Sequence, residues 1–171
     1  MSDNVYLIGM MGSGKTVTAN ALATSLGYTF VDLDTTIRLS ENLLISEIFA
    51  QKGEPYFRDA ESSALEHVSK KAKQVVATGG GIVLREANIQ RMKETGTVIL
   101  LQASVESLWQ RVQYSKDRPL LNKPDPFGTL RKILNDRGVL YEKACHFLVA
   151  TDGKTAEKVA GEIFKILRSK P

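Results

Sequence analysis

Several features that would point to a particular environment or chemistry are scarce in this sequence of 171 residues. It has one cysteine, Cys145, and two histidines, so a disulfide within the chain is excluded and no zinc-type cluster is expected. The apolar neighbours of Cys145 indicate a buried structural thiol. No apolar run approaches the roughly 18 residues of a membrane span, and the start MSDNVYLIGM lacks the segments of a signal peptide. These absences together predict a cytoplasmic protein.

The charge balance gives little support to a nucleic-acid-binding role. Lys and Arg number 23 against 19 Asp and Glu, and the resulting net charge of +4 is small and scattered along the chain. A modest positive charge suits small anionic ligands. The length fits one domain over 1–171. We therefore expect a monomer with a small-molecule partner and with neither nucleic acid nor a membrane as a partner.

Short apolar runs alternate with helical patterns along the chain. The runs are expected to form buried parallel strands, because they lack the alternation of a half-exposed sheet; they lie at 5–9, 29–33, 75–78, 97–102 and 146–150. Helices are expected at 15–26, from about 46, from about 55, and at 104–113, 126–144 and 155–168. The stretch 114–125 contains two prolines and has no period, which is typical of a mobile loop. This order predicts an α/β, doubly wound fold with a parallel sheet.

The segment GMMGSGKT at 9–16 has the spacing of a phosphate-binding loop, with Gly9, Gly14, Lys15 and Thr16 at its fixed positions. An apolar strand precedes it and a helix follows, as the motif requires. Backbone N–H groups of such a loop surround phosphate oxygens, the lysine reaches the β- and γ-phosphates, and the hydroxyl is placed for Mg²⁺. The alternative is a glycine-rich turn with a surface lysine. Because strand, spacing and helix agree, the sequence predicts a nucleoside-triphosphate site.

The segment NKPD at 122–125 matches an element that reads guanine in GTP-binding switches. There the element follows a buried strand, whereas here it lies inside the expected mobile loop. The one D-x-x-G pattern, from Asp125 to Gly128, overlaps this element instead of preceding it. The order and context of the motifs therefore argue against a GTP switch.

Two acids and three glycines follow the second and third expected strands. Asp32 and Asp34 alternate along the chain, so we expect both on one side at the carboxyl end of the sheet, where open α/β sheets bind ligands. One could hold Mg²⁺ through water and the other could engage a hydroxyl. The glycines at 79–81 offer a second place where the backbone can approach a ligand closely.

Two arginines are placed on apolar helix faces. Arg58 shares a face with Glu61 and Leu65, and Arg137 lies four residues from Ile133 on an apolar stripe. A charge in such a position either extends to solvent or holds an anion. Two such arginines in a protein with a phosphate-binding loop favour ligand binding.

Six motifs together resemble the shikimate kinase family. They are GMMGSGKT, FVDLD at 30–34, FRDAE at 57–61, ATGGG at 77–81, DRPLL at 117–121 and RGVLYEKA at 137–144, and the likeness extends over about 5–168. The resemblance implies a P-loop kinase fold, with a five-stranded parallel sheet in the order 2-3-1-4-5. It also implies a substrate-binding region at about 34–61 and a mobile lid at about 113–125. The implied reaction transfers the γ-phosphoryl group of ATP to the 3-hydroxyl of shikimate.

The resemblance also implies roles for individual residues. Those implied to carry the chemistry are Lys15, Asp34 and Arg118. ATP would be held by Gly12, Ser13, Gly14, Lys15, Thr16, Val17, Arg111, Arg118 and Lys154. Shikimate would be held by Asp34, Arg58, Glu61, Gly79, Gly80, Gly81 and Arg137. Mg²⁺ would be held by Thr16 and Asp32.

The chain departs from the family pattern at three places. Ala156 occupies the place of a proline that usually packs against adenine, and Lys154 stands where some members have arginine. The stretch ENLLISEIF replaces a glycine-containing turn before the substrate-binding helix. Two rival functions stay open at this point: another small-molecule kinase of the same fold, such as gluconate kinase, and an ATP-binding protein without catalytic activity.

Overall fold

In the computed structural model, which describes residues 3–115 and 117–169, five strands form one parallel sheet. The strands are β1 (Asn4–Ile8), β2 (Thr29–Asp32), β3 (Gln74–Ala77), β4 (Gly96–Gln102) and β5 (Phe147–Ala150). Their order across the sheet is β2-β3-β1-β4-β5, with β1 at the centre, as the family resemblance implied. The register pairs Val5 of β1 with Val75 of β3 and with Thr97 of β4. All five predicted strands are confirmed.

Eight α-helices and two 3-10 turns connect the strands in the described part of the chain. The helices are α1 (Lys15–Leu26), α2 (Leu33–Glu41), α3 (Ile45–Lys52), α4 (Glu54–Ser69), α5 (Glu86–Thr95), α6 (Val105–Val112), α7 (Pro126–Ala144) and α8 (Ala156–Arg168). The 3-10 turns are η1 (Ile82–Leu84) and η2 (Pro119–Leu121). Two helices, α2 and α5, were not predicted.

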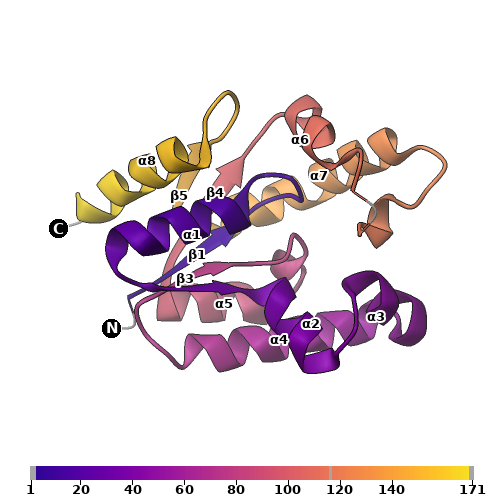
Figure 1. The fold of residues 1–171 in the computed structure, drawn as a ribbon, viewed down its shortest axis with the longest axis horizontal. Coiled ribbons are helices and arrows are strands. Elements are labelled where there is room, and N and C mark those ends of the chain that lie inside the picture. The colour runs from indigo at the N-terminus through magenta and orange to yellow at the C-terminus, as the bar shows by residue number, and fades with distance from the viewer. Residues whose placement is uncertain (1–2, 116, 170–171) are drawn as a thin grey trace.

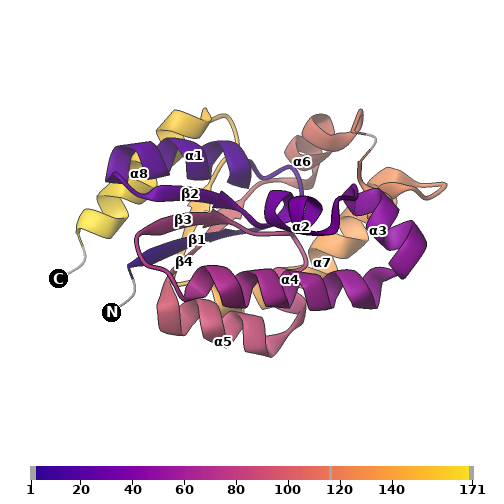
Figure 2. The same ribbon diagram turned by 60° about the horizontal axis from the view of Figure 1, so that its bottom comes forward.

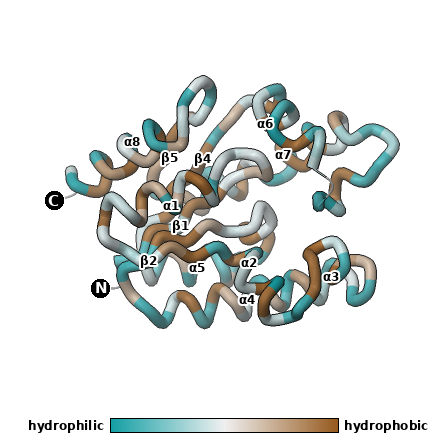
Figure 3. Tube along the Cα trace, viewed as in Figure 1, coloured by the Kyte–Doolittle hydropathy of each residue, from teal (hydrophilic) through white to brown (hydrophobic). Residues whose placement is uncertain are grey.

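The helices form a layer on each face of the sheet, as Figures 1 and 2 show. Helices α1 and α8 pack on one face, where Leu22 and Ile163 meet apolar side chains of β1, β3, β4 and β5. Helices α4, α5, α6 and α7 contribute to the core on the opposite face, with Leu65, Met92 and Leu130 fully buried. In Figure 3 hydrophobic segments follow the central strands, whereas the loop before α7 is largely hydrophilic. Burial on both faces explains why the strand sequences do not alternate.

A third, smaller cluster of buried side chains joins α2, α3 and α4 beyond the carboxyl end of β2. Ile37, Ile48 and Phe57 form its centre, and the ring of Phe49 lies 5.0 Å from that of Phe57. At its outer edge, Tyr56 donates to Glu41, 2.9 Å away. These contacts fix the three helices relative to one another.

No helix in 3–115 or 117–169 is both long and apolar enough to cross a membrane. The prediction of a buried thiol needs correction. Cys145 directly follows α7 and is half-buried at the edge of the core, with its Sγ 3.5 Å from the carbonyl oxygen of Glu142. Burial nevertheless raises the pKa of this thiol.

Candidate active site

The phosphate-binding loop connects β1 to α1, and its backbone conformation depends on glycine. Gly12 and Gly14 have φ angles of +81° and +88°, which L side chains rarely adopt. A Cβ on Gly12 would also come within 2.7 Å of Val112 Cγ1 in α6. The loop can therefore curl in front of α1, whose N-terminus favours an anion.

The Lys15 amine lies inside this loop. Its Nζ donates to the carbonyl oxygens of Gly9 and Met10, 2.8 and 2.9 Å away, and the side chain is 9% exposed. Burial lowers the pKa of Lys15 to about 8, although the carboxylate of Asp34 acts in the opposite direction. The amine also donates to the Ser13 hydroxyl, 3.5 Å away. A buried cation whose hydrogen-bond partners are these neutral oxygens is well suited to pair with a phosphate.

Thr16 and Asp32 come together beside the loop. The Thr16 hydroxyl donates to Asp32 Oδ2 at 2.7 Å, and Asp32 Oδ1 accepts from the Thr35 N–H at 2.9 Å, which caps α2. No group of three or more acidic, histidine or cysteine side chains that could hold a metal occurs within 3–115 and 117–169. A hydroxyl and one carboxylate suit Mg²⁺, which usually takes few protein ligands and completes its shell with water and phosphates.

Asp34 lies in the first turn of α2 and not on a strand. The prediction that Asp32 and Asp34 lie on the same side is confirmed, because both line one cavity. The reason given for it, alternation along a strand, was wrong, because β2 ends at Asp32 and Asp34 belongs to a helix. Burial raises the pKa of Asp34, and the neighbouring Asp32 carboxylate adds to the effect. Asp34 Oδ1 is buried and has no hydrogen-bond partner among the described residues. An unpaired carboxylate oxygen of raised pKa is a candidate proton acceptor.

Arg58 and Glu61 form a buried ion pair on α4. Arg58 Nη1 lies 2.9 Å from Glu61 Oε2, and the two residues are 8% and 1% exposed. Arg58 Nη2 also lies 3.0 Å from Glu54 Oε1. Burial raises the pKa of Glu61, while Arg58 opposes that rise. The face of α4 that carries Arg58, Glu61 and Leu65 therefore points inward, as predicted, and ion pairs hold the guanidinium of Arg58 in place.

Two of the three glycines after β3 are required because they lie very close to this ion pair. A Cβ on Gly79 would overlap Glu61 Oε1, and a Cβ on Gly81 would overlap the guanidinium of Arg58. A Cβ on Gly80 would lie 3.6 Å from Nη1 of Arg137, which is 7% exposed and comes from α7. Gly79 and Gly81 thus leave room for the Arg58–Glu61 pair, and Arg137 from a separate helix lies at ordinary contact distance from the same backbone turn.

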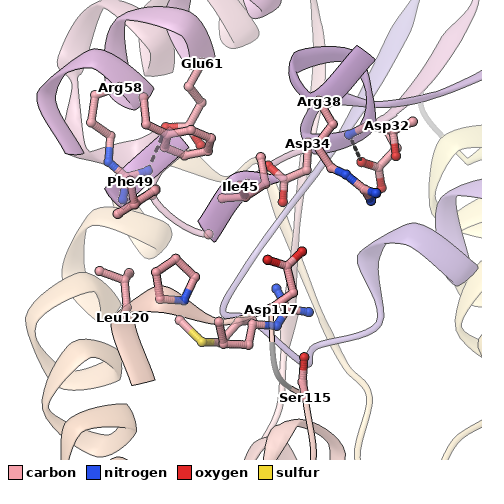
Figure 4. Close-up of a pocket in the computed structure, with 18 of the residues that line it drawn as sticks. Asp32, Asp34, Arg38, Ile45, Phe49, Arg58, Glu61, Ser115, Asp117 and Leu120 are labelled. Carbon is pink, nitrogen blue, oxygen red and sulfur yellow. Dashed lines mark hydrogen bonds and ion pairs between the residues drawn. The ribbon is translucent and has the colours of Figure 1, made fainter. Parts of the chain in front are cut away.

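Two cavities meet at this turn. The first, named here the arginine cavity, has a volume of about 400 Å³ and is lined by residues of α2, α3, α4, the glycine turn, the segment before α7, and α7 itself. Figure 4 shows Arg58 and Glu61 on one side of it, Asp32, Asp34 and Arg38 on another, and Asp117 opposite them. The second, the loop cavity, has a volume of about 310 Å³ and is lined by the phosphate-binding loop, Arg111 and Arg118.

The two cavities share a border. The residues that line both are Met11, Thr16, Asp32, Asp34, Gly80 and Arg118. A phosphate in the loop cavity and a hydroxyl in the arginine cavity would therefore meet beside Asp34. This arrangement is that of a phosphoryl-transfer site with separate nucleotide and acceptor compartments.

Comparison with known proteins agrees with this geometry. The family model described as shikimate kinase matches residues 11–168. A shikimate kinase of Thermodesulfovibrio yellowstonii is 42% identical over 95% of this chain and 93% of its own. A shikimate kinase from Acinetobacter baumannii, solved in complex with shikimate, has a TM-score of 0.96 at 35% identity, covering 99% of this chain and 94% of that chain.

The chain belongs to the shikimate kinase family. It is accordingly an enzyme, a kinase that transfers a phosphoryl group to a small molecule. A gluconokinase from Sinorhizobium meliloti covers 98% of this chain and 92% of its own, with a TM-score of 0.58 at 15% identity. That likeness concerns the fold alone, so the comparisons favour the shikimate kinase family over the rival of the same fold.

Not every residue assigned to ATP from the resemblance reaches the loop cavity of this kinase. Val17 is 60% exposed and lines it, whereas Ser13 is 1% exposed and does not line it. Arg111 lines the cavity and donates to the Gly12 carbonyl oxygen at 2.9 Å. Lys154 lines neither cavity and pairs with Glu162 of α8 at 2.7 Å.

The segment before α7 brings Arg118 to both cavities of the kinase. Its Nε is buried without a hydrogen-bond partner among the described residues, which leaves a donor available for a ligand. The same segment supplies Asp117, whose Oδ1 accepts from the Ser46 N–H of α3 at 3.4 Å. The predicted lid at 113–125 includes residue 116, which lies outside the described residues.

Sequence reasoning missed three residues around the kinase site. Arg38 and Asp117 line the arginine cavity, and Tyr141 is buried beneath Gly80. The helix α2 was not predicted, so Arg38 had no assigned position. Tyr141 lies one helical turn after Arg137, and this spacing was the available signal.

Proposed function

We propose that the enzyme transfers the γ-phosphoryl group of ATP to the 3-hydroxyl of shikimate and forms shikimate 3-phosphate, a step of aromatic amino acid biosynthesis. The observation that carries the proposal is the pair of buried arginines, Arg58 and Arg137, in a cavity that borders the phosphate-binding loop. Two guanidinium groups beside one cavity favour a carboxylate, which accepts paired charge-assisted hydrogen bonds.

On the nucleotide side, the loop N–H groups and Lys15 hold the phosphates, and Arg118 adds positive charge where the two cavities meet. Arg111 and the backbone around Gly12 are proposed to contact the rest of ATP. Thr16 and Asp32 would hold Mg²⁺, which neutralises phosphate charge when bound. Lys154 could contact ATP only if its amine gave up the ion pair with Glu162.

On the acceptor side, Asp34 takes the proton from the attacking hydroxyl. Its raised pKa places the group closer to neutral pH, where a base works most efficiently. Arg58, oriented by Glu61, and Arg137 hold the carboxylate of shikimate, while the backbone at 79–81 lies against it. Segment 113–125 would close as a lid and exclude water, which competes with the hydroxyl.

The direct test is ADP release on mixing the enzyme with ATP, Mg²⁺ and either shikimate or gluconate, with the phosphorylated product identified by mass spectrometry. We expect release that depends on shikimate and on the enzyme. Release with gluconate alone would assign the rival kinase activity. ATP binding without release in either mixture would identify an ATP-binding protein without this chemistry.

A further inference from the structure

The Tyr141 hydroxyl is buried beneath the glycine turn, yet the proposed reaction gives it no task. Tyr141 is 2% exposed and lies one turn after Arg137 on α7. Its Oη donates to the carbonyl oxygen of Gly80 at 2.5 Å. Burial raises the pKa of Tyr141 to about 12, so the hydroxyl stays protonated and remains a donor.

Because the peptide group is planar, the hydrogen bond from Tyr141 to the Gly80 carbonyl also fixes the direction of the Gly81 N–H. The carbonyl of Gly80 and the N–H of Gly81 belong to one planar trans peptide and therefore point in opposite directions. A carbonyl held by α7 thus directs the Gly81 N–H away from α7. Among the turns and loops of the described residues, this N–H donates no hydrogen bond to another backbone group.

The same peptide lies between the groups that would bind the two substrates. A Cβ on Gly80 would lie 3.5 Å from the Met11 nitrogen in the phosphate-binding loop. Gly81 lies directly against the guanidinium of Arg58, and both glycines line the arginine cavity. Glycine has no side chain to fix its conformation, so an outside contact is needed to hold this turn in one orientation.

We propose that Tyr141 is a positioning residue, whose hydroxyl fixes the Gly80–Gly81 peptide so that the Gly81 N–H joins Arg58 and Arg137 as a donor to the carboxylate of the acceptor. The inference rests on the proposed function for the identity of that acceptor. Tyr141 itself does not touch the substrate in this account. It acts through the peptide and links the turn to the helix that carries Arg137.

A tyrosine with a purely structural hydroxyl provides a matched control. Tyr6 on β1 is 0% exposed, and its hydroxyl forms a 2.7 Å hydrogen bond with Thr95 Oγ1 of α5. Neither Tyr6 nor Thr95 lines the arginine cavity or the loop cavity. Tyr141→Phe and Tyr6→Phe each remove one buried hydroxyl and keep the ring, so we expect both variants to lose thermal stability.

Shikimate affinity separates the two variants. For Tyr141→Phe we expect the Kd and KM for shikimate to rise about 5- to 20-fold, which is less than the loss of a whole hydrogen bond to a charged group, because the Gly81 N–H is displaced and not removed. The KM for ATP should stay within about twofold, because the phosphate-binding loop keeps its own contacts. Tyr6→Phe should leave the shikimate Kd within about twofold of wild type.

The amide signal of Gly81 in ¹⁵N-labelled protein reports the orientation directly. We expect a large shift on addition of shikimate to wild type and to Tyr6→Phe, and a smaller shift in Tyr141→Phe. An unchanged shikimate Kd in folded Tyr141→Phe, or an equal loss in both variants, would overturn the inference. Failure of wild-type enzyme to phosphorylate shikimate would instead contradict the proposed function.

Discussion

At the scale of single residues, the burial of the Lys15 amine has a consequence for pH dependence. Its pKa is lowered to about 8, so the amine loses its charge in the free enzyme as pH rises through that value. Phosphate binding needs the cation, so MgATP affinity should fall about tenfold between pH 7 and 9. Affinity measured against pH by calorimetry tests this, with Lys15→Arg as the control that stays charged.

The same pKa shift acts on stability with the opposite sign. An unfolded lysine titrates near 10.5, so between about pH 8 and that value the unfolded chain binds more protons at this site. The contribution of Lys15 to the stability of the unliganded protein therefore increases with pH over this window. A fall in MgATP affinity with pH that is equally steep in Lys15→Arg would contradict the assignment to Lys15.

Asp34 should separate nucleotide binding from transfer. Asp34→Asn keeps the shape of the side chain and removes the base, so we expect turnover to fall by at least about 100-fold. MgATP affinity should stay within a few-fold of wild type, because Thr16 and Asp32 keep their contact. If nucleotide affinity collapses instead, the roles of Asp32 and Asp34 are reversed.

The raised pKa of Asp34 also predicts its effect on stability. Burial disfavours the ionised carboxylate of Asp34 in the folded protein. The contribution of Asp34 to the free energy of unfolding therefore decreases as pH rises from the pKa of the unfolded chain to the raised pKa of the folded protein. The neutral asparagine removes this cost. We therefore expect the unliganded Asp34→Asn protein to melt no lower than wild type at neutral pH, measured by calorimetry.

At the scale of elements, the segment before α7 is proposed to act as a lid that carries Arg118. Arg118 lines both cavities, while its neighbour Asp117 contacts the start of α3. An arginine delivered to a transferring phosphoryl group supplies about 10³- to 10⁵-fold in rate. Arg118→Ala should lower kcat by at least about 100-fold and change the KM for shikimate far less. Small, equal changes in kcat and KM would contradict a role of Arg118 in the transfer step.

Most elements could be predicted because their sequence signals are local. Helix α7 was predicted with its observed bounds, and an apolar stripe runs through it. Helix α2 was missed because Thr35, Thr36 and Ile37 are β-branched and favour a strand. Its true start depends on Asp32, whose side chain caps the helix and ends β2. Helix α5 has only two buried apolar residues, Ile89 and Met92, and this pattern was too weak to be read.

The site could be predicted where a motif has fixed spacing, as at Lys15 and Thr16. Contacts between distant segments could not be predicted in this way. The hydrogen bond from Tyr141 to Gly80 spans 61 positions, and no local pattern indicates it. Resemblance alone was a weaker guide than motif spacing. It assigned Lys154 to ATP, but the amine of Lys154 pairs with Glu162 and the residue lines neither cavity.

At the scale of the whole molecule, the arginine cavity is assembled from both halves of the chain. Helix α4 follows β2 and carries Arg58, whereas α7 precedes β5 and carries Arg137. Two buried like charges repel each other; Arg58 forms ion pairs with Glu61 and Glu54, whereas Arg137 forms none within the described residues. In the proposed complex, the carboxylate of the acceptor would supply a negative charge beside Arg137. If the proposed roles are right, the enzyme should prefer an acceptor that carries a negative charge.

The most direct measurement of this central claim compares kcat/KM for shikimate with kcat/KM for its amide, in which a neutral amide replaces the carboxylate. The amide keeps the reacting hydroxyl and loses the anion, so we expect its kcat/KM to be about 10- to 100-fold lower with wild-type enzyme. In Arg137→Lys the difference in kcat/KM between shikimate and its amide should be smaller, because lysine lacks the planar fork that holds a carboxylate. Equal values for shikimate and its amide would contradict the account, since Arg58 and Arg137 would then not bind a carboxylate.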